Sequence, residues 1–380
     1  MGQRVIQLLA RTSTSAWGSL PTDVWRVGTR REPGEHCAIL LQEGVEPDVS
    51  PLYVSRSPDL RGPGPTIHLP QQLQHVCSGD VIVVPDDGQR VQVVWKTTAA
   101  HNSILLTERC ENYCLMCSQP PKDRNDSYLY TRAERIVSAL PPSARALGLT
   151  GGEPTIDPEA FLRLLHHCAA EAPALSIHVL SNGRRFADRA FAQAYAEIPL
   201  ADAMVGIPLY GSEPGLHDYV VQAEGAFNQA VKGILNLAAF GRPVEIRVVI
   251  QKHTVPALGE IATYIARNLP FASQVALMGL EMTGLARPNA ALVWVDPADY
   301  QDELLAAYNI LRDAGIATRL YNHQLCVTDE RMWPAAVQSI SDWKNDYPDL
   351  CSPCAVKDRC CGVFTTSGNR LSQHLQPILC

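Results

Sequence analysis

Six short apolar segments, each followed by a segment of helical periodicity, occupy residues 104–313 of this 380-residue chain. The predicted strands are Ile104–Thr107, Ala146–Thr150, Ser176–Leu180, Met204–Leu209, Val244–Ile250 and Val275–Leu280. The predicted helices are Arg132–Ala139, Pro158–Ala172, Ala187–Ala196, Ala226–Ala239, Ala257–Asn268 and Pro297–Asp313. Strands that alternate with helices predict an α/β fold with a parallel sheet, here a partial barrel of six β/α units. The functional groups of such folds gather at the carboxyl ends of the strands.

The flanking regions differ from this pattern, so we expect three domains with bounds 1–98, 99–315 and 316–380. Residues 1–98 contain short β-type runs, at His36–Leu41, Val81–Val84 and Val91–Trp95. Asp86-Asp87-Gly88, between two of these runs, predicts a hairpin turn. This region is therefore predicted to be a small β-rich domain, and its strand edges are a hypothetical docking place for a peptide substrate. Residues 316–380 lose the alternation and carry a dense group of cysteines.

Three cysteines follow the first predicted strand at the spacing C-x3-C-x2-C, namely Cys110, Cys114 and Cys117. Three thiolates on one loop can bind three irons of a cubane cluster and leave the fourth iron open to another ligand. A structural zinc site would require a fourth protein ligand and usually has paired C-x2-C units. The spacing therefore predicts a [4Fe–4S] cluster on this loop.

The second predicted strand ends in Gly151-Gly152-Glu153-Pro154, one β/α unit after the cysteines. Together the two motifs resemble the radical S-adenosylmethionine (SAM) superfamily. The resemblance implies that residues 151–154 bind the amino group of the methionine half of SAM, since glycines let backbone approach a ligand and a carboxylate accepts from an ammonium. Most members have an aromatic residue where this chain has Met116, which can pack against adenine in its place. The alternative for residues 151–154 alone is an ordinary strand-to-helix turn.

The resemblance implies further SAM contacts at the ends of the later strands. Ser181 and Asn182 would lie near the nucleoside, and Ser212 near the ribose hydroxyls. Arg247 would pair with the methionine carboxylate, which suits a guanidinium fork. The alternatives are a common turn for Ser181-Asn182 and a structural ion pair for Arg247. We assign no catalytic residue from the sequence.

The tail contains a second cysteine group, C-x2-C-x5-C, formed by Cys351, Cys354 and Cys360. With Cys326 as a fourth ligand these thiolates would close either a second cubane cluster or a tetrahedral zinc site. Peptide-modifying members of the superfamily often carry an auxiliary [4Fe–4S] cluster in such an extension, and this resemblance favours iron–sulfur. Cys361 and His323 are alternative ligands, and Cys380 is expected to be a free thiol.

The chain also resembles a narrower family, the His-Xaa-Ser system radical SAM maturases of the C-type. The residues that carry the resemblance are CLMCSQPP at 114–121, GIPLYGSEPGLHD at 206–218, YNHQLC at 321–326 and SISDWK at 339–344. It implies a ribosomally made peptide or small protein with His-Xaa-Ser repeats as substrate. It further implies a second radical SAM maturase, a small accessory protein, and an electron donor such as flavodoxin or ferredoxin. The cluster would reductively cleave SAM to a 5′-deoxyadenosyl radical that takes a hydrogen atom from the substrate.

The composition narrows the possible partners, cellular compartments and functions of the protein. The formal charge of −7 argues against binding of nucleic acid through phosphate contacts. Because the sequence contains no long apolar run and no secretory signal, we expect a cytoplasmic protein without a membrane partner. In that compartment the twelve cysteines favour metal ligands over disulfides. Two rival functions remain: a radical SAM enzyme acting on a nucleoside, RNA or small metabolite, and a non-catalytic iron–sulfur or zinc protein.

Overall fold

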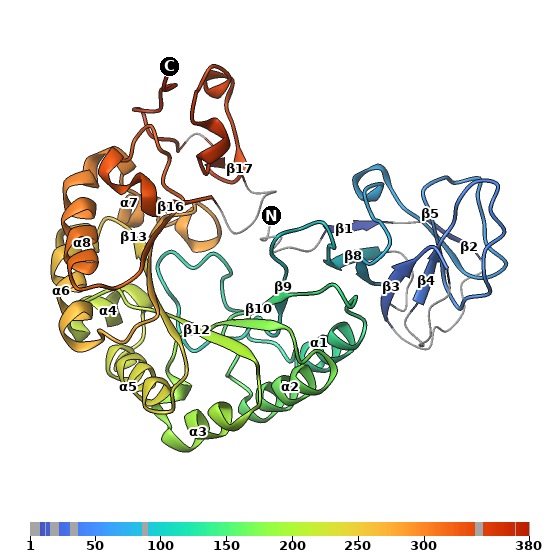
Figure 1. Cartoon of the computed structure of the whole chain (residues 1–380), viewed down its shortest axis with the longest axis horizontal. Helices are drawn as coiled ribbons and strands as arrows, with labels where there is room; N and C mark the ends of the chain where they lie inside the picture. Colours follow the sequence, from blue (N-terminus) through green and yellow to red (C-terminus); the bar gives the residue numbers. More distant parts are fainter. Residues whose placement is uncertain are drawn as a thin grey trace.

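The computed structural model describes residues 8–11, 13–15, 23–30, 37–85, 90–338, 345–368 and 370–379. A curled sheet lines the inside of an arc, and the helices lie outside it (Figure 1). A β-rich domain stands to one side of the arc, and the C-terminal segment lies over its other end. No helix in the described ranges combines the length and the apolar character needed to cross a membrane.

The curled sheet is parallel throughout, which confirms the predicted α/β fold with a partial barrel. Its strands, in spatial order, are β9 (Ser103–Leu105), β10 (Ala146–Thr150), β11 (Ser176–Leu180), β12 (Asp202–Pro208), β13 (Val244–Ile250), β14 (Gln274–Gly279), β15 (Thr318–Tyr321) and β16 (Ala336–Val337). The last two strands were not predicted, and they extend the sheet beyond residue 315. They escaped prediction because they are short and no α-helix separates them.

The helices of the arc include a counterpart of each of the six predicted helices. They are α1 (Tyr128–Ser138), α2 (Pro158–Glu171), α3 (Arg189–Glu197), α4 (Pro214–Val221), α5 (Ala226–Ala239), α6 (Leu258–Asn268), α7 (Ala290–Val293) and α8 (Gln301–Asp313). The start of α2 shows why these segments fold locally: Asp157 accepts a hydrogen bond from the Ala160 amide, and proline occupies the first helical position. The helix then buries Phe161, Leu164 and Leu165 at helical spacing. Helices α4 and α7 were not predicted.

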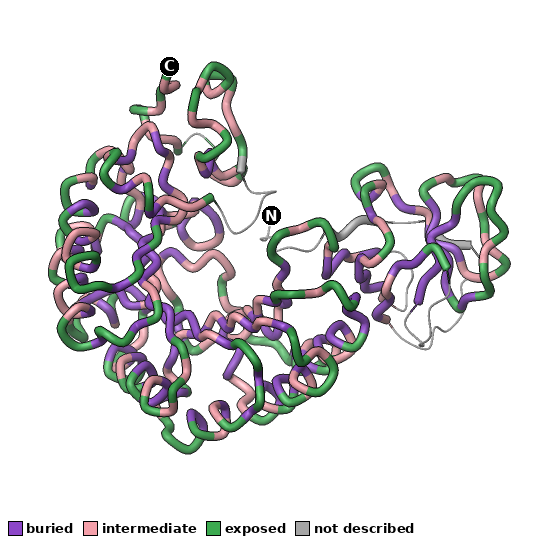
Figure 2. Tube along the Cα trace, viewed as in Figure 1, coloured by how far each residue is buried: buried purple, intermediate pink, exposed green. Residues whose placement is uncertain are grey.

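The two faces of the barrel sheet differ in chemistry. On β13, Val244, Ile246, Val248 and Ile250 are buried in the core shared with the helices. Because strand side chains alternate, Glu245 and Arg247 point to the other face, which lines the inside of the arc. Figure 2 shows the burial concentrated in the strands and on the inner sides of the helices. The inner face of β13 therefore carries two charged side chains, whereas its outer face is apolar.

The β-rich domain contains one mixed sheet in the order β1-β8-β7-β3-β4-β5-β6-β2. Its strands are β1 (Leu8–Arg11), β2 (Ser13–Ser15), β3 (Val24–Gly28), β4 (Cys37–Leu40), β5 (Tyr53–Ser55), β6 (Thr66–His68), β7 (Val81–Val83) and β8 (Arg90–Trp95). Strands β7 and β8 pair antiparallel, as the predicted hairpin requires, but its turn Asp86-Asp87-Gly88 and also His36 lie outside the described residues. The domain is joined to the barrel by a shared core and by ion pairs from Asp23 to Arg132 (2.7 Å) and Arg135.

The C-terminal segment is fastened to the carboxyl ends of β14 and β15. Its two short strands, β17 (Asn345–Asp346) and β18 (Val363–Phe364), pair antiparallel. Gln324 donates to the Gly362 carbonyl (3.0 Å), and Arg287 donates to the Thr366 carbonyl (3.2 Å). The segment 339–344 that contributed to the family resemblance lies outside the described residues, as does Cys380.

Candidate active site at the carboxyl end of the barrel

The loop that carries the first three cysteines follows β9 and is built on a buried carboxylate. Asp126, which is fully buried, accepts hydrogen bonds from the Thr107 hydroxyl (2.9 Å), the Glu108 amide (2.5 Å) and the Arg109 guanidinium (3.0 Å). Further along, the amides of Tyr113 and Leu115 donate to the carbonyls of Val221 and Val220 at the end of α4. The cysteine loop is therefore fixed at both of its ends. Asp126 was not identified from the sequence, because its three partners lie far from it along the chain.

The three thiols of the loop lie at one cavity and sit in a poorly solvated environment. Burial raises the pKa of Cys114 to about 12, with a further contribution from Cys117, and burial also raises the pKa of Cys110 and of Cys117. A thiolate is the ligand form of cysteine, so a cationic metal centre would offset this desolvation. Within the described ranges no three Cys, His, Asp or Glu side chains converge as ligands of a single metal ion. A cubane cluster, in contrast, spreads its thiolates over separate irons.

The cavity has a volume of about 380 Å³ and opens at the carboxyl ends of the strands. Residues from every strand between β9 and β15 contribute to its lining, together with the cysteine loop and one residue of the tail. The predicted residues in the lining are Cys110, Cys114, Met116, Cys117, Gly151, Gly152, Ser181, Asn182 and Arg247. The lining residues that were not predicted include Asn112, Tyr210, Glu281, Tyr321, Asn322 and Phe364. The structure thus brings the two sequence motifs to one space.

Residues 104–264 match the family model of the radical SAM superfamily. This segment is a radical SAM domain. No curated protein matches the chain. Among solved structures, SuiB from Streptococcus suis bound to S-adenosylmethionine is similar at 16% identity and a TM-score of 0.46, covering 57% of this chain and 49% of that one. The chain thus spans about half of that structure's length.

Two other solved structures are similar in part. The native anSMEcpe structure with bound AdoMet and Cp18Cys peptide has 15% identity and a TM-score of 0.45, over 57% of this chain and 62% of that one. A radical SAM methyltransferase from Sphaerobacter thermophilus has 17% identity and a TM-score of 0.43, over 68% of this chain and 83% of that one.

The two glycines of the radical SAM domain's second motif allow close contact between two loops. A Cβ atom on Gly151 would lie 2.6 Å from the Thr107 carbonyl oxygen, and one on Gly152 would overlap the Arg109 carbonyl. The Gly152 and Glu153 amides donate to these same two carbonyls. Only glycine permits this approach. The motif therefore locks the cysteine loop as well as lining the cavity.

Glu153 is fully buried and does not line the cavity. One carboxylate oxygen accepts from the Thr155 amide and hydroxyl and from the Ser181 hydroxyl (2.8 Å), and the other accepts from the Asn182 amide (2.6 Å). Burial raises the pKa of Glu153 to about 7, with the Glu111 charge adding to the effect. In this arrangement the carboxylate holds the turn after β11 in place, whereas the resemblance implied a direct contact with SAM. Pro154 also lies outside the lining, and its carbonyl accepts from the Tyr130 hydroxyl (2.9 Å).

The turn that Glu153 holds presents a free donor to the cavity. Asn182 lines the cavity, and its buried side-chain Nδ2 has no hydrogen-bond partner among the described residues. Buried polar atoms are nearly always paired, so this amide fits a ligand in the cavity. The Asn182 amide donor, the three cysteines in the lining and the cavity volume together fit a bound nucleoside cofactor such as SAM.

Ionisable side chains gather around Gly206, a residue in the lining of the radical SAM domain's cavity. A Cβ atom at Gly206 would lie 3.0 Å from Arg247 Cδ and from His178 Nε2, and 3.1 Å from Glu245 Oε1. Arg247 donates to Glu245 at 2.5 Å, and the imidazole of His178 lies 3.6 Å from the same oxygen. Burial lowers the pKa of His178, against the opposing effect of Glu245. Arg247 thus has both the structural ion pair and the place in the cavity that the sequence left as alternatives.

Ser212 lies away from the cavity. It lines a separate, open depression on the outer side of the barrel with Pro256, Thr263 and other residues of the α6 region. Its neighbour Tyr210 lines the cavity instead, and packs with Met116 in one buried cluster. The segment after β12 leads into α4, and in this segment Ser212 faces outward. Helix α4 was not predicted.

The tail cysteines gather at a second place, beyond the carboxyl end of β15. Burial raises the pKa of Cys351. The nearby thiols of Cys326, Cys354 and Cys360 add to this effect. A hydrogen bond from Cys361 lowers the pKa of Cys360 to about 6. Cys361 itself is buried, and its pKa is raised by the same hydrogen bond. The place of Cys360 among the other three thiols suits a ligand.

His323 lies three residues before Cys326 and is buried, and neither ring nitrogen has a hydrogen-bond partner within the part of the chain that the structure describes. Burial lowers the pKa of its imidazole to about 4. Its ring contacts Tyr300 edge-on at 6.1 Å between centroids. The neutral imidazole packs in the core between the barrel and the tail.

Proposed function

We propose that this chain is a radical SAM enzyme that modifies a ribosomally made peptide or small protein, one that carries His-Xaa-Ser repeats. The observation that carries the proposal is the single cavity that Cys110, Cys114 and Cys117 share with Gly151 and Gly152 inside a radical SAM domain. The peptide substrate follows from the narrower sequence resemblance and from the tail cysteines. The net charge of −7 disfavours the nucleic-acid alternative.

In the proposed site the three thiolates of the cysteine loop hold a [4Fe–4S] cluster with one open iron. When bound, the cluster held by Cys110, Cys114 and Cys117 would supply, together with SAM, the one-electron chemistry needed for radical abstraction of a hydrogen atom from the substrate. The chain's own residues position the ligands. The Gly151-Gly152 backbone contacts the methionine half, the Asn182 amide donates to the cofactor, and Arg247 pairs with the methionine carboxylate.

The protein also limits access of water to the cavity. Met116 and Tyr210 are both nearly buried and line the wall beside the cysteines. Phe364 of the tail also lines the cavity. Such apolar walls protect a reactive radical from solvent and side reactions.

Cys326, Cys351, Cys354 and Cys360 are proposed to hold the auxiliary [4Fe–4S] cluster. The peptide is proposed to dock at an edge strand of the β-rich domain, where β1 and β2 end the sheet. The further partners are a second radical SAM maturase, a small accessory protein and a flavodoxin or ferredoxin as electron donor.

The first test is the iron and acid-labile sulfide content after anaerobic reconstitution. The wild-type chain is expected to hold about eight irons, and the variant Cys110→Ala/Cys114→Ala/Cys117→Ala about four. After reduction with SAM present, the wild type should release 5′-deoxyadenosine and the variant none. Zinc in place of iron, or cleavage of SAM by the triple variant, would contradict the proposal.

A further inference from the structure

Arg184 connects the cysteine loop to the turn that follows β11. Its Nη1 donates to the side-chain oxygen of Asn112 at 2.7 Å, and its Nε donates to the side-chain oxygen of Gln229 on α5 at 2.5 Å. Asn112 is 3% exposed and lies between Cys110 and Cys114 on the loop. The guanidinium thus joins the loop to a segment that lies 72 residues further along the chain.

Asn112 also contacts a cysteine of the loop. Its backbone amide donates to the Cys110 Sγ at 3.4 Å. A hydrogen bond strengthens when its acceptor carries negative charge, as sulfur does in a thiolate. Because Arg184 holds the side chain of Asn112, it also restrains the backbone amide of the same residue. A chain of contacts therefore runs from the guanidinium through Asn112 to Cys110.

The guanidinium of Arg184 has no carboxylate in contact within the segments that the structure describes. Its partners are the side-chain oxygens of two neutral amides, with a longer contact to the Glu111 carbonyl at 3.5 Å. The side chain is half-buried, so solvent screens its charge less than the charge of an exposed arginine. The positive charge therefore acts on the cysteine loop.

A cation and an N–H donor at this place favour a reduced cluster over an oxidised one. Reduction adds one negative charge to a [4Fe–4S] cluster, and the reduction potential depends on net charge and on hydrogen bonds to the sulfurs. Both the guanidinium and the Asn112 amide attract negative charge at Cys110. Their combined effect on a cluster held by this loop would be to raise its reduction potential.

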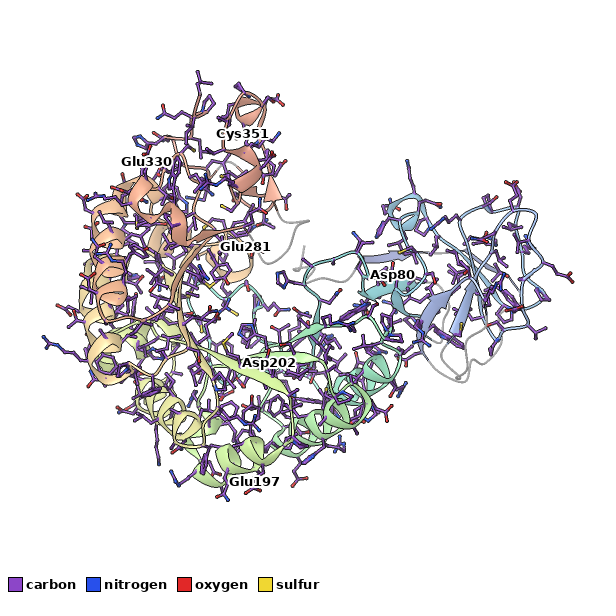
Figure 3. The ribbon with its side chains drawn as sticks, in the orientation of Figure 1. Asp80, Glu197, Asp202, Glu281, Glu330 and Cys351 are labelled. Atoms are coloured by element: carbon purple, nitrogen blue, oxygen red, sulfur yellow. The ribbon has the colours of Figure 1, made fainter. Side chains whose placement is uncertain are left out.

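The tail cysteines lie in another part of the molecule. Arg184 lies between β11 and α3, and α3 stands at the bottom of the arc in Figure 1. Figure 3 shows Cys351 of the tail at the upper end of the arc. The interaction between two charges weakens with their separation. The effect of Arg184 is therefore expected to be larger at the cysteine loop than at the tail.

We propose that Arg184 is a positioning residue of the cysteine loop, which acts through Asn112 to raise the reduction potential of the loop cluster. The inference deepens the proposed function and rests on it, because it requires a cluster on Cys110, Cys114 and Cys117. It assigns a role in electron uptake to a side chain that does not line the cavity.

The test measures the loop cluster by EPR in the anaerobically reconstituted full chain, held at the midpoint potential of the wild type. The signal of this cluster is the one that Cys110→Ala/Cys114→Ala/Cys117→Ala lacks. Arg184→Met should lower the ratio of reduced to oxidised loop cluster about tenfold, which equals about 59 mV for one electron. Arg185→Met, at the exposed neighbouring arginine, is the matched control and should keep the wild-type ratio.

Asn112→Ala removes the loop partner of the guanidinium and should lower the ratio in the same direction. If Arg184 acts through Asn112, the double variant should show less than the sum of the two single effects. Fully additive effects would overturn the route through Asn112.

The remaining outcomes separate this inference from the proposed function. An unchanged ratio in Arg184→Met overturns the inference and leaves the proposed function in place. If Arg184→Met takes up no loop cluster, Asn112→Ala decides, and an unchanged ratio there overturns the inference. If the wild type shows no signal that the triple cysteine variant lacks, the inference and the proposed function are both overturned.

Discussion

The guanidinium of Arg247 donates to the carboxylate of Glu245 at 2.5 Å, and the two residues are next-but-one neighbours on β13. Glu245 is 1% exposed, so it acts as a fixed support below the cavity. The pair orients the guanidinium toward the cavity that Arg247 lines. This relationship explains how a charged side chain inside the barrel can both stay paired and face a ligand.

Arg247→Lys is expected to weaken SAM binding by about tenfold or more, because an ammonium cannot pair with Glu245 and also present a fork to a carboxylate. Equilibrium dialysis with the reconstituted protein measures the dissociation constant. Arg312→Lys, on the outer side of α8, serves as the control and should bind SAM as the wild type does. Unchanged SAM binding by Arg247→Lys would remove Arg247 from the cofactor site.

Gly152→Ala is expected to disrupt the cysteine loop, since the added Cβ overlaps the Arg109 carbonyl. The reconstituted variant should hold about four irons where the wild type holds about eight, as only the tail cluster would remain. Gly259→Ala is the matched control, because a Cβ there meets no atom of the described segments within 4 Å and the residue lies in α6. It should keep full iron content and gain roughly 0.5–1 kcal/mol of stability. Full iron content in Gly152→Ala would show that the cysteine loop tolerates the added Cβ atom.

Cys360 and Cys361 make a matched pair of substitutions in the tail. Cys360→Ala should lower the iron content from about eight to about four, because the thiolate that joins Cys326, Cys351 and Cys354 is lost. Cys361→Ala should retain about eight irons, since this thiol is buried and donates to the Gly362 carbonyl. Mössbauer or EPR spectra would assign the lost iron to the auxiliary cluster. The reverse pattern would make Cys361 the ligand.

The stability of the fold should decrease on acidification because of His217. This residue of α4 is 2% exposed, and its ring accepts from the Tyr210 amide at 3.2 Å. Burial lowers its pKa to about 4 from 6.5. The unfolded chain therefore binds the proton more readily, so stability is fully present above about pH 6.5 and is lost as the pH falls toward 4.

The loss from this one group between about pH 8 and pH 5 is about 2 kcal/mol. Denaturant unfolding of the wild type and of His217→Gln at both pH values measures it, and the variant should lose less stability than the wild type. His166→Gln, an exposed change on α2, should behave as the wild type. A pH dependence that is identical in all three proteins would contradict the assignment.

The barrel was predictable because its strands and helices carry local signals. Val244–Ile250 and Ala226–Ala239 were predicted with the bounds that the structure has, since their apolar periodicity is complete. Helix α4 was missed although its signal was present: Glu213 caps the amides of Gly215 and Leu216, and Pro214 occupies the first turn. The assignment of Ser212 to the ribose came from the family resemblance, and the structure places this residue at a separate depression.

The sequence allowed prediction of the site residues that follow strand ends. It did not allow prediction of those whose place depends on contacts between residues far apart in the chain. Ser181 and Asn182 were expected near the nucleoside from the family resemblance, and they follow a parallel strand, where such folds gather functional groups. The support by Glu153 was not foreseen, because it depends on hydrogen bonds to Thr155 and to the next strand end. Phe364 could not be assigned to the cavity, since no local pattern indicates where the tail folds back.

The attachment of the tail through Thr366 and Phe364 has a consequence for biosynthesis. The radical SAM domain emerges from the ribosome well before these residues, and domains generally fold as they emerge. During that interval the barrel can hold the cysteine loop and the glycine motif together, but Phe364 of the tail, which lines the cavity, is still missing. A nascent chain would thus present a nucleoside pocket open on one side. A ribosome-stalled chain ending before residue 362 is therefore expected to bind SAM without closing the pocket around a substrate.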